Sequence, residues 1–327
     1  MNLSGLSKIA CVVLGAFALC GAASAQGAFP ARPVTLVVPY SAGGGHDAMA
    51  RIVAERLTAR LGQTVLVENK PGANGMLGAE HVTRAAADGY TLLFASPAEV
   101  VIAPNAYKSM RYDPAKDLVP VTLAGITPLV IVAHPSAGVK TLPELIALAR
   151  RQPNTLSFGT SGNATSQHLA GAWLNSMAGI DLLHVPYKGA GPATNDVLGG
   201  TIPLAIVGMA PVLPHIRSGK LVPIAVLTPE RVSFAKDVPT VAESPGMKGY
   251  EVSHWMGVFM PARTPRERVE RMQKEIAAVL SAPEVRERLL GMGIDPVGNT
   301  PAEFRDFLAA DRERFQKMFR LSGLSPE

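Results

Sequence analysis

The sequence predicts an α/β protein of two lobes, in which each lobe is a mainly parallel sheet flanked by helices. Short apolar and β-branched runs alternate with helical patterns along residues 34–95 and again along 156–227. Such alternation is typical of parallel strands joined by helices that cover the sheet. In each half, a loop of glycine or other small residues follows a strand and leads into a helix.

The first of these loops follows the first predicted strand. Val34 to Val38 is a β-branched run that indicates a buried strand, and Pro39 ends it. Gly43 to Gly45 then lets the backbone turn tightly, because glycine has no Cβ. From Asp47 onward the apolar residues have helical spacing. A strand, a glycine turn and a helix start direct backbone N–H groups and a positive helix end at one point, so the loop predicts an anion site.

The second loop repeats this arrangement in the other half of the chain. A short strand over 156–159 leads into the small-residue loop Thr160 to Thr165, and an amphipathic helix runs from Ser166 to Met177. Each lobe therefore offers one helix start that suits an anion. A cleft between two such lobes is where small ligands usually bind.

Long extended runs suggest where the chain passes between the lobes. Residues 118–126, 129–133 and 250–260 are extended and apolar, so we place crossings near residues 125 and 250. The chain after the leader has about 300 residues, enough for two domains. We expect lobe 1 over 26–124 and 251–327, lobe 2 over 125–250, and the ligand cleft between them. Within lobe 1 we expect a helix over 79–87.

The N-terminal residues resemble an export signal rather than part of the fold. Lys8 precedes an apolar run from Ile9 to Leu19, and Ala23-Ser24-Ala25 fits a cleavage site. The run is shorter than the roughly 20 apolar residues that a membrane span needs. We therefore expect a cleaved signal peptide over 1–25 and a soluble, periplasmic mature protein.

Composition excludes several classes of function. Both cysteines, Cys11 and Cys20, lie in the expected leader, so the mature chain has no thiol for disulfides, catalysis or metal binding. The full chain carries 31 basic and 26 acidic residues, and this mild excess is spread along it. Such a diffuse charge suits an anionic ligand and does not indicate nucleic acid.

Enzyme motifs are incomplete, with one exception. Gly43 to Ala48 fits G-x-G-x-x-A after a strand, and Glu68 follows at the spacing of a dinucleotide-binding fingerprint. The sequence geometry leaves that interpretation open, although an exported protein does not normally meet free nicotinamide cofactors. Gly159 to Asn163 misses the last position of G-x-S-x-G, and Ser233 to Lys236 matches S-x-x-K without its companion motifs. The seven histidines never pair at helical metal-site spacing, so we expect neither a metal nor a cofactor.

Asp47 has two possible roles at the start of its helix. It can complement the helix dipole or cap the helix. It can also brace the glycine loop or reach a ligand through water. The sequence alone does not decide between these roles.

Many blocks of the chain, in order, are similar to one family. They run from about Pro30 to near the C-terminus and include Arg32-Pro-Val-Thr-Leu-Val-Val-Pro-Tyr40, Ala42-Gly-Gly44 with Asp47 and Arg51, Val67-Glu-Asn-Lys-Pro-Gly-Ala-Asn-Gly75, Ala87-Asp-Gly-Tyr-Thr-Leu-Leu93, His168-Leu-Ala-Gly171, Val185-Pro-Tyr-Lys-Gly189 and Asp237-Val-Pro-Thr-Val-Ala-Glu243. The chain resembles the Bug-type receptors, the extracytoplasmic solute-binding proteins of tripartite tricarboxylate transport systems.

The resemblance implies a two-lobed periplasmic-binding-protein fold, a Venus flytrap that closes on a small carboxylate and delivers it to membrane permease subunits. It implies no catalysis, and we expect a monomer. In such receptors two loops grip the carboxylate, partly through ordered water. The positions here are Tyr40, Ser41, Ala42, Gly43, Gly44 and Asp47 in the first loop, and Thr160, Ser161, Gly162, Asn163, Ala164, Thr165 and His168 in the second.

One departure from the family bears on the ligand. Where the family often has a Phe-Asp pair in a lobe-2 strand, this chain has Ile206-Val207 followed by Gly208. Val207 then replaces an aspartate that could pair with a ligand ammonium, and we count Val207 and Gly208 among the expected ligand-binding residues. We hypothesise a carboxylate ligand without an ammonium group, whose non-acid end meets apolar surface. The alternatives are a sensor that passes its ligand-bound state to a signalling partner, or an enzyme on a dinucleotide-binding scaffold.

Overall fold

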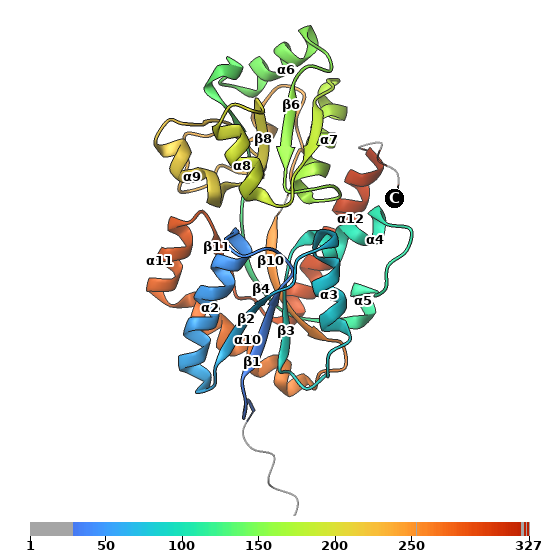
Figure 1. The fold of residues 1–327 in the computed structure, drawn as a ribbon, viewed down its shortest axis with the longest axis vertical. Coiled ribbons are helices and arrows are strands. Elements are labelled where there is room, and N and C mark those ends of the chain that lie inside the picture. The colour runs from blue at the N-terminus through green and yellow to red at the C-terminus, as the bar shows by residue number, and fades with distance from the viewer. Residues whose placement is uncertain (1–28, 253, 322–323, 325, 327) are drawn as a thin grey trace, which may run out of the picture.

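The computed structural model describes residues 29–252, 254–321, 324 and 326. The chain forms two lobes, one above the other in Figure 1, joined by extended segments near the middle. The signal peptide expected over 1–25 lies outside the described residues. Within the described part of the chain, every helix is too short or too polar to cross a bilayer.

Lobe 1 is built on a six-stranded sheet in the order β11-β4-β10-β3-β1-β2. β1 pairs in parallel with β2 and β3, while β10 pairs antiparallel with both β3 and β4. β1 to β4 therefore share one direction and β10 runs against them. The strands are β1 Val34–Val38, β2 Val65–Asn69, β3 Thr91–Ala95, β4 Leu118–Ile126, β10 Trp255–Pro261 and β11 Asp295–Pro296.

Helices cover both faces of this sheet because its strands are apolar on both sides. One apolar cluster packs the sheet against α2 Gly45–Leu61, α10 Arg266–Ser281 and α11 Pro283–Gly291. The other packs it against α3 Met76–Thr83 and α12 Pro301–Leu321. Four shorter elements complete the lobe: η1 Ala73–Gly75, the π-helix η2 Ala98–Ile102, α4 Ala103–Ala106 and α5 Pro114–Asp117.

Lobe 2 has a five-stranded sheet in the order β7-β6-β8-β5-β9. Helices α8 Ala190–Leu198 and α9 Met209–Arg217 cover one face, and α6 Leu142–Arg151 and α7 Ser166–Ala178 cover the other. The strands are β5 Leu129–Ala133, β6 Ser157–Thr160, β7 Leu183–Pro186, β8 Leu204–Gly208 and β9 Val222–Val226. The short helix η3 Pro135–Ala137 follows β5.

Each sheet contains one full-length strand that runs against the others, β10 in lobe 1 and β5 in lobe 2. These are the strands by which the chain enters each lobe from the other. β1 and β6 run toward the other lobe and end in the two predicted loops. β10 and β5 start at the boundary between the lobes and run away from it, so they are antiparallel to the other full-length strands. The two crossing segments lie side by side, because the Thr127 N–H donates to the His254 carbonyl at 2.8 Å.

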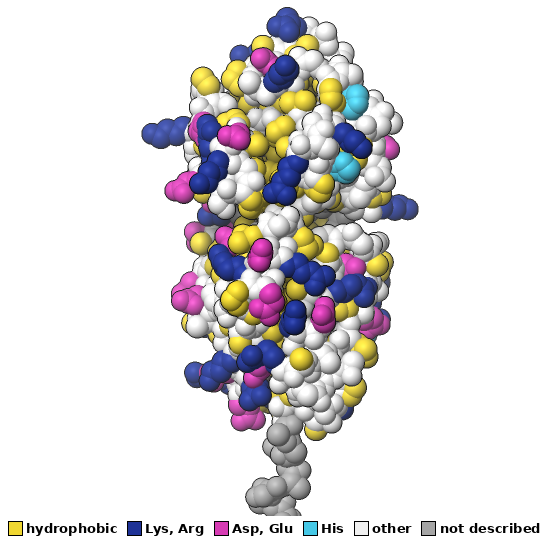
Figure 2. All heavy atoms as spheres, turned by 90° about the vertical axis from the view of Figure 1, so that its left-hand side faces the viewer, with side chains coloured by type: hydrophobic (Ala, Val, Ile, Leu, Met, Phe, Trp, Pro, Cys, Tyr) yellow, Lys and Arg dark blue, Asp and Glu magenta, His cyan; other side chains and the backbone are white. Residues whose placement is uncertain are grey.

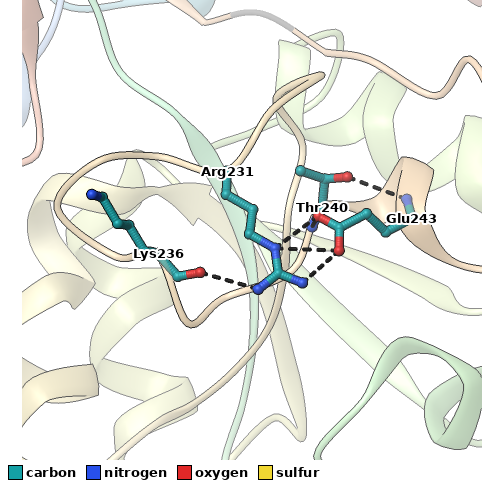
Figure 3. A network of polar contacts seen from close by, with 4 residues as sticks. All are labelled: Arg231, Lys236, Thr240 and Glu243. Carbon is teal, nitrogen blue, oxygen red and sulfur yellow. Dashed lines mark hydrogen bonds and ion pairs between the residues drawn. The ribbon is translucent and has the colours of Figure 1, made fainter.

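The segment that returns from β9 to lobe 1 is held by a polar network (Figure 3). Arg231 Nη2 donates to Glu243 Oε2 at 2.5 Å, and Arg231 Nη1 donates to the Lys236 carbonyl at 3.1 Å. Thr240 and Glu243 form a capping box at the short helix η4 Val241–Glu243. The hydrogen bond from Arg231 lowers the pKa of Glu243 to about 2. The S-x-x-K match at Ser233 lies in this loop, where Lys236 serves the network through its backbone.

Candidate functional site

The first predicted loop connects β1 to α2 and exposes its backbone. Ser41 to Gly44 are exposed, and Gly43 has a φ of 87°, which glycine adopts without strain. Gly44 is the N-cap residue of α2 and supplies no side-chain cap. The N-terminus of this 17-residue helix therefore lies directly beneath an exposed glycine turn, with no side chain capping it.

Asp47 braces this loop. Its Oδ2 accepts hydrogen bonds from the Gly43 N–H and from Arg51 Nε, both at 2.9 Å, and its Oδ1 accepts one from Asn69 Nδ2 at 3.0 Å. Burial alone would raise the pKa of Asp47, but the hydrogen bonds from Arg51, Gly43 and Asn69 together lower it. With 4% of its surface exposed, the carboxylate is committed to the loop.

Tyr40 anchors the other end of the same loop. Its hydroxyl donates to Glu99 Oε2 and lies against Ser96 Oγ, each at 2.6 Å, and its carbonyl accepts from Asn69 Nδ2 at 3.0 Å. Glu99 is fully buried in the π-helix η2, a kind of helical irregularity often found at functional sites. Burial raises the pKa of Glu99 to about 7. We did not predict this support from the sequence, although a lone acid within the apolar run 98–103 is a detectable signal.

The second loop connects β6 to α7. Thr165 caps α7: its Oγ1 accepts from the His168 N–H at 3.3 Å and donates to the Gly162 carbonyl at 2.8 Å. Gly162 has a φ of 143° and Ala164 a φ of 49°, so the backbone of this loop is unusual at two positions. Asn163 is exposed, and Ser161 and Ala164 are half-buried. A capped helix start again lies beneath an open loop.

Two stacked imidazoles support the second loop. The rings of His168 and His184 lie 3.9 Å apart and nearly parallel. His168 Nδ1 accepts the Ala164 N–H at 3.2 Å, and His184 Nε2 lies 2.6 Å from Thr160 Oγ1. Burial lowers the pKa of His184 to about 3, and burial also lowers the pKa of His168. Both rings are therefore uncharged at neutral pH.

Acid is expected to destabilise lobe 2 through these rings. The unfolded chain binds a proton on His184 near pH 6.5 and the folded chain only near pH 3, so this contribution to stability is complete above about pH 6.5 and is lost as the pH falls toward 3. Because the site is partly exposed, we expect a loss on the order of 2 kcal/mol between about pH 7 and pH 4.5. Urea unfolding at several pH values measures it. A His184→Gln variant should make the profile less steep, because other buried histidines such as His254 still contribute. An equally steep profile in that variant would contradict this assignment.

The short helix η1 links the two loops across the lobes. Asn74 Nδ2 donates to the Asn163 carbonyl at 2.5 Å and to Tyr107 Oη at 2.8 Å. Ala73 and Asn74 both have a positive φ, 46° and 51°, which costs about 1–2 kcal/mol for residues other than glycine. The next residue, Gly75, packs under Tyr40 and Glu99, where a Cβ would lie 3.0 Å from the Glu99 carboxyl. Strained backbone thus sits where the lobes touch.

Three further residues singled out in the sequence lie away from the loop surfaces. Val207 is fully buried in the cluster beneath α8 and α9, while its neighbour Ile206 packs on the opposite face of the sheet. Helices cover both faces of β8, so Val207 offers no surface to a ligand in this conformation. Gly208 is buried as the N-cap residue of α9. Trp255 is fully buried, and its Nε1 donates to Asp311 Oδ2 at 2.7 Å in the core of lobe 1.

The side chains of the two loops favour binding over catalysis. Ser166 Oγ lies 2.8 Å from His254 Nδ1, but Ser166 is 2% exposed, and among the described residues the contacts of His254 include no carboxylate. The described residues contain no group of three or more side chains placed to hold a metal ion. What remains at the surface is backbone N–H, hydroxyl and amide groups at two helix starts, a set that binds anions.

A cavity of about 530 Å³ lies apart from these loops. It opens between α9 and α11, on the side of the molecule that Figure 2 shows, where basic and acidic side chains are interspersed. It is lined by Arg217, Phe234, Pro283, Arg286, Glu287, Leu290 and Gly291. None of the predicted ligand-binding residues contributes to it.

Comparison with known proteins identifies the family. The family model described as "Tripartite tricarboxylate transporter family receptor" matches residues 49–324. The chain belongs to this receptor family. A receptor of this family is a solute-binding component of a transporter, so the protein is not an enzyme. The Bug-type resemblance and the two-lobed periplasmic-binding-protein fold are confirmed.

Relatives and solved structures agree with this assignment. A Pseudomonas protein encoded between tcbD and tcbE is 38% identical over 291 residues, covering 89% of this receptor and 86% of that protein. A structure of an R. palustris protein with adipate superposes with a TM-score of 0.87 at 32% identity, covering 91% of this receptor and 100% of that chain. The periplasmic binding protein BugD gives a TM-score of 0.85 at 34% identity, with 91% and 100% covered.

Proposed function

We propose that this receptor captures a small organic carboxylate in the periplasm and delivers it to the permease subunits of a tripartite transporter. The observation that carries the proposal is a pair of helix N-termini, that of α2 in lobe 1 and that of α7 in lobe 2, each preceded by one of the two loops. The helix η1 connects these loops, because Asn74 donates to the Asn163 carbonyl and Gly75 packs under Tyr40. In this proposal the ligand-contacting residues are Tyr40 to Gly44, Thr160 to Thr165 and His168. Asp47 acts as a positioning residue. Cleavage of the leader after Ala25 would release the mature receptor.

Helix dipoles and neutral donors, rather than cations, hold the carboxylate in this arrangement. Over residues 40–47 and 160–168 the sequence contains no lysine or arginine. Charge-assisted hydrogen bonds from backbone N–H groups and hydroxyls are stronger than neutral ones, and lobe closure strengthens them further by excluding water. The carboxylate class is also supported by the adipate held by the R. palustris neighbour.

The acidic side chains near the loops explain why we propose a ligand without an ammonium group. Asp47 is the one acid in those two segments, and it is 4% exposed and already paired with the Arg51 guanidinium and with two loop donors, so it is not placed to pair with a ligand cation. Glu99 is fully buried behind Tyr40. An amino acid would therefore bury its ammonium without a partner, which is costly.

A thermal-shift panel of mono-, di- and tricarboxylates, aromatic acids and amino acids tests the proposal on the mature chain. We expect carboxylates to stabilise the protein, by about 2.7 kcal/mol at a roughly hundredfold excess over the dissociation constant. Amino acids should give no shift. Tight binding of aspartate or glutamate with no response to plain carboxylates would contradict the proposed ligand class. Turnover of a bound acid by the purified protein would contradict the receptor function.

A further inference from the structure

A cluster of polar side chains lies where the two lobes and the crossing segments meet. His46 is in the first turn of α2, Ser166 begins α7, and His254 and Thr127 lie in the two crossing segments. His254 joins them: its Nδ1 lies 2.8 Å from Ser166 Oγ, and its carbonyl accepts the Thr127 N–H at 2.8 Å. The cluster therefore lies between the two helix starts that form the proposed carboxylate site.

His46 and Thr127 are the two members of this cluster whose bonding is incomplete among the described residues. The His46 ring lies 4.8 Å from that of Tyr40 and 5.4 Å, edge to face, from that of His254. Its Nε2 is buried and has no hydrogen-bond partner among the described residues, and the same holds for Thr127 Oγ1. An unpaired buried polar atom costs about 1–3 kcal/mol, so such atoms mark places where a partner is missing.

The electrostatics of the cluster restrict what that partner can be. Burial lowers the pKa of His254 to about 4, and burial together with the nearby His254 lowers the pKa of His46 well below its ordinary value. Both imidazoles are uncharged at neutral pH. With its proton on Nε2, a neutral imidazole donates one hydrogen bond from that nitrogen to a hydroxyl, keto or carboxylate oxygen, and it gains nothing from a methylene or methyl group.

We propose that His46, with its proton on Nε2, is a specificity-determining residue that donates a hydrogen bond from this buried nitrogen to a second oxygen of the ligand. This inference rests on the proposed function, because it assumes that a carboxylate occupies the neighbouring loops. The preferred ligand is then a carboxylate that also carries a hydroxyl, keto or second carboxyl group. The sequence led us to expect that the part of the ligand away from its carboxylate meets apolar surface. In this proposal that part instead carries an oxygen that bonds to His46.

Matched ligand pairs test the proposal by calorimetric titration of the mature protein. Adipate is compared with hexanoate, which has a methyl group in place of one carboxylate, and malate with succinate, which lacks the hydroxyl. In the wild type we expect the oxygen-rich member of at least one pair to bind about tenfold more tightly or better, the factor that one satisfied hydrogen bond supplies. In His46→Phe, which keeps a ring without nitrogen, that difference should fall to within about threefold.

Variants and controls separate this role from a structural one. His46→Gln keeps a hydrogen-bonding group and should retain part of the preference, and His46→Ala replaces the phenylalanine variant if that variant does not fold. His81→Phe changes an exposed histidine on α3 and should leave the preference intact. Carboxylate binding without any difference within the pairs, or a difference that survives in His46→Phe and His46→Ala, overturns this inference alone. Failure of every carboxylate to bind the wild type overturns the proposed function as well.

Discussion

Replacing Asp47 by alanine is expected to abolish measurable carboxylate binding and to lower the free energy of unfolding by about 2–4 kcal/mol. The Gly43 N–H, Arg51 Nε and Asn69 Nδ2 all lose their shared acceptor. Asn69 also holds the Tyr40 carbonyl, so the loop is released at both ends. Most of the loss comes from the Gly43 and Asn69 bonds, because the Arg51 side chain is 54% exposed and its ion pair is weakened by solvent. Titration and urea unfolding of the variant measure the two effects.

A matched aspartate elsewhere separates the loop from general stability. Asp113 also accepts a backbone N–H, that of Ala115 at 3.0 Å, as the N-cap of α5 in the same lobe. Asp113→Ala should cost about 1 kcal/mol, the usual loss for an N-cap, without changing affinity. If Asp47→Ala is destabilised but binds the ligand as tightly as the wild type, the loop does not need its brace and the proposed site is misplaced.

The sequence predicted strands well where an apolar run has clear ends. Leu118–Ile126 and Leu129–Ala133 were predicted to the residue, because the bend at Thr127-Pro128 separates two buried runs. The expected helix over 79–87 is Met76–Thr83 instead. It begins three residues earlier, directly after Asn74 and Gly75 with positive φ, and it ends before the alanines Ala85 to Ala87. Such a start depends on backbone conformation rather than on apolar spacing.

The loops themselves could be predicted, but their supports could not. Glycine turns and small-residue loops are local patterns, so Tyr40 to Gly44 and Thr160 to Thr165 are visible in the sequence. The supports join distant segments: Glu99 lies 59 residues from Tyr40, and His254 lies 88 residues from Ser166. No periodicity links such pairs: the pairing of β1 with β3 brings Tyr40 to Glu99 within lobe 1, and the crossing segment brings His254 to Ser166.

Replacing Gly171 by alanine is expected to have the largest effect of any single methyl group added to lobe 2. A Cβ there would lie 2.2 Å from Phe158 Cζ, much closer than side-chain carbons approach. Phe158 is 1% exposed and packs against His184, so its ring has no free space to enter. Overpacking typically costs about 1–3 kcal/mol, and two contacts as short as 2.2 and 2.3 Å place this position at the upper end. A helical Gly→Ala change returns about 1 kcal/mol, so we expect a net loss of about 2 kcal/mol, measured by urea unfolding. Affinity should fall too, because α7 must shift and the second loop ends at its N-terminus.

Two variants decide whether the clash is the cause. Gly191→Ala in α8 adds a methyl group where nothing lies within 4 Å, so it should be neutral or stabilising and should bind the ligand normally. Phe158→Leu removes the ring edge that the methyl group added by Gly171→Ala would meet, so the double variant should be more stable than the sum of the two single changes predicts. If the two changes are additive, Gly171 is not packed against Phe158 as the structure has it. If the double variant regains both stability and ligand affinity, the position of α7 on the sheet determines how well the ligand binds.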